Sequence, residues 1–271
     1  MDTNFIVIFS YFIVIYRIVQ LYEVLIAMSF QNQFTKTTTD ANLMETVHHG
    51  SAEYPFRYYY ENIALFDFKC IDWHWHSELE FIYIESGNVV FDIGTVHFEL
   101  NEGNGIMINS KILHRLQSSS DAIIPNFLFQ PSFIAPQDSL IYKKYINPVI
   151  SSSLEYLVFQ PDIPWQKKAL EIIKTIIAVQ ETEFNREIIV SMSVQQLWIL
   201  LLENLTFDQF ENMGAVISRT RLQLMMQYVH AHYSENITLE DIARTANISK
   251  STALHLFQNN LKLTPVKYLI N

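Results

Sequence analysis

The spacing of apolar residues changes once along this chain, and that change limits the folds the chain can adopt. Between about 54 and 134 the apolar residues lie in short aromatic and β-branched segments, interrupted by Gly, Asn and Ser. Such segments at near-regular spacing predict the strands of a sandwich or barrel. After Pro136 the apolar residues recur at helical intervals, as in Leu170, Ile173 and Ile177. We therefore expect an α+β protein in which a β-barrel precedes a set of helices.

The first 27 residues differ from everything that follows. The segment 5–27 is apolar and long enough to cross a bilayer as a helix. It contains Arg17 and Glu23, each of which costs about 2.5–3.5 kcal/mol near the membrane centre. We expect a hydrophobic extension upstream of the working first residue, Met28, and do not expect membrane association. A single membrane anchor is the alternative.

Charge and cysteine content indicate an intracellular protein whose tail differs from its body. The net charge is −10, yet six Lys/Arg against three acids from residue 218 onward make that segment +3 and leave −13 for the rest. An acidic body with a basic tail fits a chain whose last segment alone meets phosphate. Cys70 is the only cysteine, which excludes an internal disulfide and favours a reducing cytoplasm.

The stretch WHWHSELE places candidate ligands close together. His74 and His76 lie two apart and face the same way on a strand, so they can share one ligand or metal ion. On one straight strand Glu80 would lie about 20 Å from His74, so the chain must turn near Ser77 and Glu78 to bring Glu80 to the site. His114 is the candidate fourth member. We expect His48 and His49 to be solvated, and His97 to be a structural or rim residue.

These residues carry a resemblance to the cupin family. The spacing His74-x-His76-x3-Glu80-x6-Gly87 matches the first cupin motif, and residues 103–114 resemble the second, with Asn109-Ser110 where a proline is usual. In metal-binding cupins the residues that match His74, His76, Glu80 and His114 hold the ion. In cupin sensor domains of regulators they often contact a ligand without metal.

The resemblance implies a ligand-binding role for these four residues without a metal or other cofactor. One divalent metal ion held by the same four is the alternative.

Trp73 and Trp75 alternate to the other face and are expected in outer packing. A set of aromatic residues is expected to line the barrel and to suit many small molecules: Phe66, Phe68, Phe81, Tyr83 and Phe91.

The last fifty residues predict a helix-turn-helix. Thr238 is a good N-cap, and Asp241 three residues on completes a capping box. Asn247-Ile248 forms a short turn, and Ser249 caps the next helix. Two short helices joined by a tight turn place the second helix in the major groove of DNA.

The tail resembles the first helix-turn-helix of AraC-type regulators. The residues that carry the resemblance are Leu239, Ile242, Ala243, Ser249, Ser251, Phe257, Thr264, Pro265, Tyr268 and Leu269. The resemblance implies base contacts for Ser251, Leu254 and His255, with Lys250 and Thr252 near phosphate or the groove edge. His255 stands where the family usually has Arg, and Arg can pair with guanine in a bidentate way that a neutral imidazole cannot. The family carries a second such unit, so the chain is expected to be truncated or to dimerise.

Together these features predict a ligand-responsive, DNA-binding transcriptional regulator that is not an enzyme. Its expected partners are duplex DNA, a small-molecule effector and a second copy of the chain, in the cytoplasm. The expected parts are the extension 1–27, a cupin-like sensor domain 28–135, a helical linker and dimerisation region 136–217, and an incomplete helix-turn-helix module 218–271. Two helices are expected between Trp165 and Leu205 with a break near Asn185, and their apolar stripe serves either a dimer surface or an intramolecular core. The alternative function is a cupin metalloenzyme that uses His74, His76, Glu80 and His114 as metal ligands.

Overall fold

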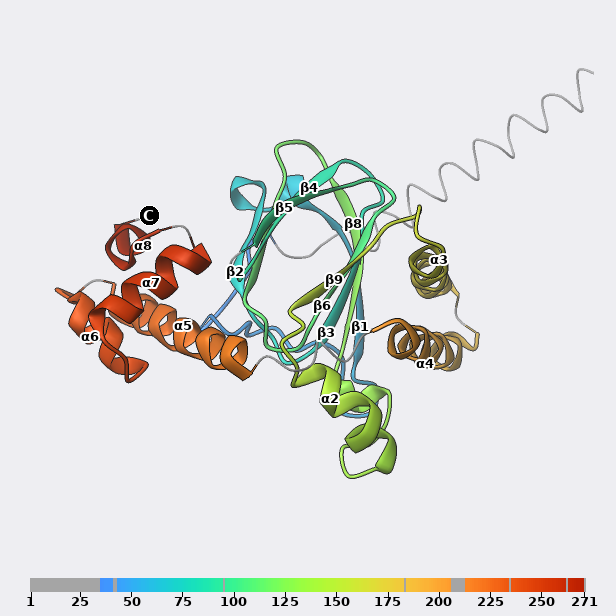
Figure 1. Cartoon of the computed structure of the whole chain (residues 1–271). Helices are drawn as coiled ribbons and strands as arrows, with labels where there is room; N and C mark the ends of the chain where they lie inside the picture. The colour runs from blue at the N-terminus through green and yellow to red at the C-terminus, as the bar shows by residue number, and fades with distance from the viewer. Residues whose placement is uncertain are drawn as a thin grey trace, which may run out of the picture.

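A barrel of two antiparallel sheets forms the centre of the protein (Figure 1). The computed structural model describes residues 35–40, 43–94, 96–182, 184–205, 213–233, 235–261 and 263–270, so the hydrophobic extension 1–27 lies outside the described residues. One sheet has the order β1 (Phe56–Asn62), β8 (Ile123–Phe129), β3 (Leu79–Tyr83), β6 (Gly105–Ile108) and β9 (Tyr156–Phe159). The other has the order β2 (Cys70–His74), β7 (His114–Gln117), β4 (Asn88–Ile93) and β5 (Val96–Asn101). The expected α+β class with a cupin-like barrel is confirmed.

The barrel interior is filled by alternate residues of both sheets. In β4 the side chains of Val89, Phe91 and Ile93 are buried while their neighbours are not, which is the period-two pattern of a strand with one covered face. They pack with Ile82 of β3 and Ile106 of β6. Burial of such aliphatic and aromatic side chains is the main force that holds the two sheets together.

Two helices cover the outer face of the five-stranded sheet (Figure 1). They are α3 (Pro164–Ala178) and α4 (Arg186–Asn204). The predicted break is confirmed, because Asn185 adopts a left-handed backbone with φ 62° directly before α4. The inner faces of both helices pack on β3 and β8, so β3 is buried on its two sides.

One strand was missed by the sequence interpretation. β9 lies inside the range 136–217 that was expected to be a helical linker, and it pairs with β6. The sensor barrel therefore does not end at residue 135. A strand of four residues is too short for period-two alternation to stand out in the sequence. The short helices η4 (Tyr142–Ile146) and α2 (Asn147–Ile150) connect it to β8.

The tail is helical as predicted. It contains α5 (Met213–His232), α6 (Leu239–Thr245), α7 (Lys250–Leu261) and α8 (Pro265–Ile270). The capping box is present with both of its hydrogen bonds: the Thr238 side chain accepts from the Asp241 N–H, and the Asp241 side chain accepts from the Thr238 N–H. Ser249 also caps α7, because its Oγ accepts a hydrogen bond from the Thr252 N–H at 3.2 Å. These local bonds satisfy the backbone donors that both short helices leave open at their first turns.

The tail helices pack against the barrel on the side opposite α3 and α4 (Figure 1). Met225 and Met226 of α5 are fully buried in a cluster that also includes Leu113 of the barrel. Trp73 and Trp75 pack against this cluster, which agrees with their predicted outward orientation. In the part of the chain that the structure describes, no helix is both long and apolar enough to span a membrane.

Candidate functional site

The predicted histidines and glutamate meet at one end of the barrel. His74 is the last residue of β2 and pairs with His114, the first residue of β7. The chain then turns after His76 and enters β3 in the other sheet, which brings Glu80 back toward the histidines as expected. Glu80 Oε2 lies 3.4 Å from His76 Nε2 and 3.2 Å from His114 Nε2. All four residues are buried.

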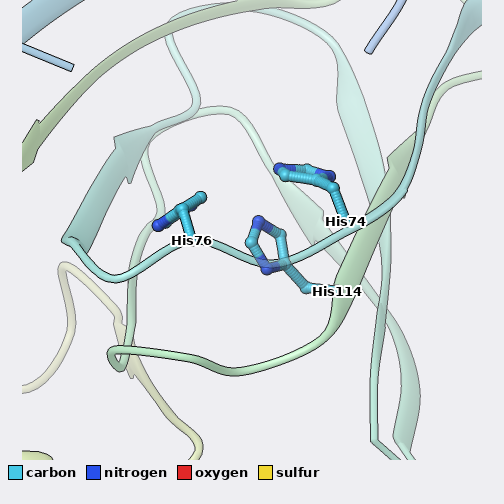
Figure 2. A group of neighbouring side chains, drawn as sticks. All are labelled: His74, His76 and His114. Atoms are coloured by element: carbon cyan, nitrogen blue, oxygen red, sulfur yellow. The ribbon is translucent and has the colours of Figure 1, made fainter. Parts of the chain in front are cut away.

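The three imidazoles point toward a common space (Figure 2). Each ring offers one nitrogen to a set whose members all lie within 4.8 Å of one another. The Nδ1 atoms are engaged elsewhere: His74 Nδ1 lies 2.7 Å from the Asp72 carbonyl, and His114 Nδ1 lies 2.8 Å from the Ile112 carbonyl. His76 Nδ1 lies 3.3 Å from the Glu78 carbonyl. A carbonyl can only accept, so Nδ1 carries the proton in His74 and His114. In His76 both ring nitrogens face acceptors, because Nε2 also bonds Glu80 Oε2.

In His114 this tautomer leaves an acceptor facing an acceptor. A neutral imidazole protonated on Nδ1 presents a lone pair at Nε2, and an ionised carboxylate has only lone pairs to present. The buried Nε2 of His114 makes no hydrogen bond although Glu80 Oε2 is 3.2 Å away. Such a set is stabilised when a cation lies between the lone pairs, either a proton on a ring or a metal ion.

Burial and neighbouring groups shift the pKa of His74 and of Glu80. Burial, with a further contribution from His114, lowers the pKa of His74 to about 3, so this ring is neutral at pH 7. Burial alone would raise the pKa of Glu80, but the imidazoles of His114 and His76 beside the carboxylate lower it below the ordinary value. Three imidazole nitrogens and one carboxylate oxygen form a donor set that suits zinc and other divalent transition metals.

A fourth histidine, His49, borders the site, although the sequence interpretation placed it in solvent. His49 is buried, with Nε2 3.0 Å from Glu45 Oε2 and Nδ1 2.9 Å from the Tyr59 hydroxyl. Burial opposes its protonation, but the Glu45 carboxylate raises the pKa of His49 above its ordinary value. The expectation of a solvated His49 was therefore wrong, since a tertiary contact with β1 and not local polarity decides its burial. His48 is exposed, as expected.

The free space at the histidines is small. The cavity lined by His49, His74, His76 and Glu80 has a volume of ≈ 40 Å³. That volume holds one or a few water-sized species, because one water needs roughly 10–15 Å³ of such space. It is far below the roughly 300–1,000 Å³ of typical organic ligand pockets.

The expected aromatic lining is only partly present. Phe66 and Phe91 belong to the barrel interior. Phe81 and Tyr83 instead pack on the side of α3 and α4, because they alternate with the inward-facing Ile82. Phe68 is 100% exposed, so its predicted place in the barrel was wrong. His97 is exposed at the rim and bonded to Asp92 at 2.7 Å, as expected for a residue outside the site.

The residues predicted to contact DNA share one surface of α7. Ala253 and Phe257 are fully buried against α5 and α6. Among the predicted contact residues, Leu254 is half-buried. The other four are exposed: Lys250, Ser251, Thr252 and His255. Lys250 Nζ lies 3.2 Å from Glu240 Oε2, and His255 Nε2 lies 2.9 Å from Asn259 Nδ2. Spacings of three and four residues place Ser251, Thr252 and His255 on the side of α7 that faces away from the core, and Lys250 is exposed as the first residue of the helix.

A cupin-type barrel joined to a helix-turn-helix defines a class, the transcriptional regulators with a ligand-binding domain. A family model for the AraC-like ligand binding domain matches residues 66–136. The uncharacterized HTH-type transcriptional regulator YdeC of Bacillus subtilis is 32% identical over 239 residues, which cover 86% of this chain and 80% of YdeC. The chain therefore belongs to the AraC-type transcriptional regulators.

Two further similarities are more distant. The lactose operon transcription activator of Staphylococcus xylosus is 24% identical over 147 residues, which cover 52% of each chain. A crystal structure of apo ToxT K231A from Vibrio cholerae covers 82% of this chain and 98% of its own, with 10% identity and a TM-score of 0.34.

Proposed function

We propose that this regulator binds duplex DNA through α7 and responds to a ligand held by its barrel. The observation that carries the proposal is the surface of α7. Its buried residues form the module core, while Lys250, Ser251, Thr252 and His255 remain open to solvent at the start of the helix. In helix-turn-helix proteins the N-terminal part of the second helix contacts base edges. This placement also favours a regulator over the metalloenzyme alternative, and a regulator that binds DNA would act in the cytoplasm.

The proposal is tested by a fluorescence anisotropy titration that measures binding of the protein to the DNA upstream of its own gene. Lys250→Ala should weaken binding similarly on all sequences and lower the slope of log K against log salt by about one. Lys168→Ala, which removes an exposed lysine on α3, is the matched control. Stoichiometric metal with no DNA retention at low salt would support the metalloenzyme instead.

We propose a second copy of the chain as the protein partner. The stripe Ile188, Met192 and Ile199 on α4 is 58%, 65% and 57% exposed, although the opposite face of the same helix is core. Spacings of four and seven residues place the three on one side of the helix. One helix-turn-helix neutralises few phosphates, so two copies joined by α4 would supply the affinity that one lacks.

Sedimentation equilibrium tests the dimer. Met192→Glu should shift the chain to monomers and weaken DNA binding in parallel. Leu140→Glu alters an equally exposed apolar residue, 76% exposed and off this stripe, and should leave both unchanged. A wild-type chain that is monomeric at micromolar concentration contradicts the dimer but leaves the α7 proposal intact.

We further propose that the ligand at His74, His76, Glu80 and His114 is one divalent cation. The sequence interpretation expected a small-molecule effector there and kept one divalent metal ion as the alternative. Two observations favour the ion: the buried His114 Nε2 has no hydrogen-bond partner although the Glu80 carboxylate is 3.2 Å away, and the space holds only a water-sized species. The backbone carbonyls that accept from Nδ1 would orient the rings for an ion.

A further inference from the structure

A second hollow lies between the barrel and the tail helices. This cleft has a volume of ≈ 670 Å³, against ≈ 40 Å³ at the histidines. Its barrel wall includes Phe68, Trp73 and Arg115, and its other wall includes Tyr233 of the α5 end and Tyr268 of α8. The volume falls in the range of organic ligand pockets, and such pockets occur preferentially where two domains meet.

The cleft walls are rich in aromatic side chains. Phe68 is fully exposed and has φ 58°, and Lys69 beside it has φ 52°. Two successive non-glycine residues in the left-handed region are sterically unfavourable, and such conformations concentrate at ligand sites. The fold thus holds an aromatic ring at the rim of the cleft at a cost in backbone conformation, although the ring buries nothing within the chain.

The charged residues that line the cleft have a net charge of zero. Two are basic, Lys36 and Arg115, and two are acidic, Asp67 and Asp72. Arg115 is already held in place, because it donates to Cys70 Sγ at 3.2 Å and to Gln117 Oε1 at 2.9 Å. A guanidinium has five N–H donors, so these two bonds leave donors for an oxygen of a bound molecule. A ligand with a net charge would meet a group of its own sign as well as a partner.

We propose that this cleft binds an uncharged, planar aromatic molecule that carries one hydrogen-bond acceptor. The rings of Phe68, Trp73 and Tyr233 contact its faces, and the Arg115 guanidinium donates to its oxygen. The two walls belong to the barrel and to the DNA-binding module, so the bound molecule stabilises one arrangement of the two. The site lies on the outer face of the β2–β7 sheet. It adjoins the histidine cavity through Lys36 and Thr37, but none of His74, His76, Glu80 and His114 lines it.

The single cysteine of the chain provides a direct test. Cys70 lines the cleft, so its reaction with the uncharged reagent 4,4′-dithiodipyridine reports whether the cleft is occupied. The probe is 2-naphthol. We expect its fluorescence anisotropy to rise to a plateau as protein is added, which indicates saturable binding. Cys70 should be protected with the same half-saturating concentration. The anionic 2-naphthoate and the cationic 2-naphthylmethylammonium should bind more weakly. The whole chain is used without DNA, so the result is independent of the α7 proposal.

Two matched variants locate the site. Phe68→Ala should raise the dissociation constant of 2-naphthol about two- to tenfold, because one aromatic pair is lost. Phe68 is fully exposed, so this variant keeps the fold. Phe184→Ala removes another aromatic residue, 81% exposed before α4, and should leave the constant unchanged. Any of three results would overturn the proposal. Cys70 could react at an unchanged rate at saturating 2-naphthol, both variants could have equal effects, or 2-naphthoate could bind as tightly as 2-naphthol.

Discussion

Addition of a divalent metal to the metal-free protein should raise its melting temperature. The site supplies three imidazole nitrogens and one carboxylate oxygen from the folded barrel, and the unfolded chain does not hold these groups together. A ligand that binds only the folded state stabilises by RT ln(1 + [L]/Kd), which is about 2.7 kcal/mol at a hundredfold excess over Kd. For a chain of this size that corresponds to a rise of roughly 5–10 °C.

The loss of one donor gives the sharper form of this prediction. If His76→Ala weakens the metal tenfold, the same metal concentration stabilises by only about 1.4 kcal/mol, and the rise in melting temperature falls to about half. The comparison is between the shifts with and without metal, so any effect of the substitution on the metal-free fold cancels. His97→Ala removes an exposed histidine outside the site and is the control.

The assay is thermal unfolding with Zn²⁺, Ni²⁺, Co²⁺ or Mn²⁺ after chelator treatment and dialysis. Metal content is measured in parallel, and the absorption of bound Co²⁺ reports nitrogen ligation. The reasoning about converging lone pairs fails if none of these ions binds stoichiometrically. It also fails if His97→Ala reduces the shift as much as His76→Ala does.

Three further outcomes are expected. Thr238→Ala should destabilise the tail helices by about 1 kcal/mol in thermal unfolding, because the capping box is lost. Thr238 lowers the pKa of Asp241, so the contribution of this cap is full above the ordinary Asp pKa of about 3.9 and is lost as pH falls below it. His255→Arg should change base preference at one operator position by about 1–3 kcal/mol in a binding assay on a base-substituted operator series, and equal effects on all sequences would contradict base contact. Asn109→Ala should destabilise the barrel by about 2–4 kcal/mol in denaturant unfolding, because its Nδ2 donates to the buried Val149 and Leu154 carbonyls; a loss under 1 kcal/mol would contradict this.

Local features of this chain were predictable from its sequence because short-range chemistry decides them. The capping box at Thr238 involves residues only three apart, and a helix of any tertiary context would form it. The break at Asn185 and the buried face of α7 follow from backbone preference and helical period in the same way. The turn that brings Glu80 to the histidines was also predictable, since on one straight strand Glu80 would lie about 20 Å from His74 and could not join the group that it meets through His76 and His114.

Contacts between distant segments were not predictable. β9 is a strand because β6 offers it an open edge, and four residues carry no periodic signal of their own. His49 is buried because Tyr59 and Glu45 bond both of its ring nitrogens. Phe68 and Phe81 were assigned to the lumen by composition, but the register of each strand and loop sends them elsewhere.

The sequence by itself determined which donors could meet, since motif spacing selects two histidines and a glutamate on either side of one turn. Only the tertiary structure decided how much room they leave. Cavity volume depends on the packing of side chains from many strands, and here that packing leaves space for an ion at the histidines. The larger space arises where the tail helices meet the barrel wall, and no local pattern encodes a gap between two surfaces.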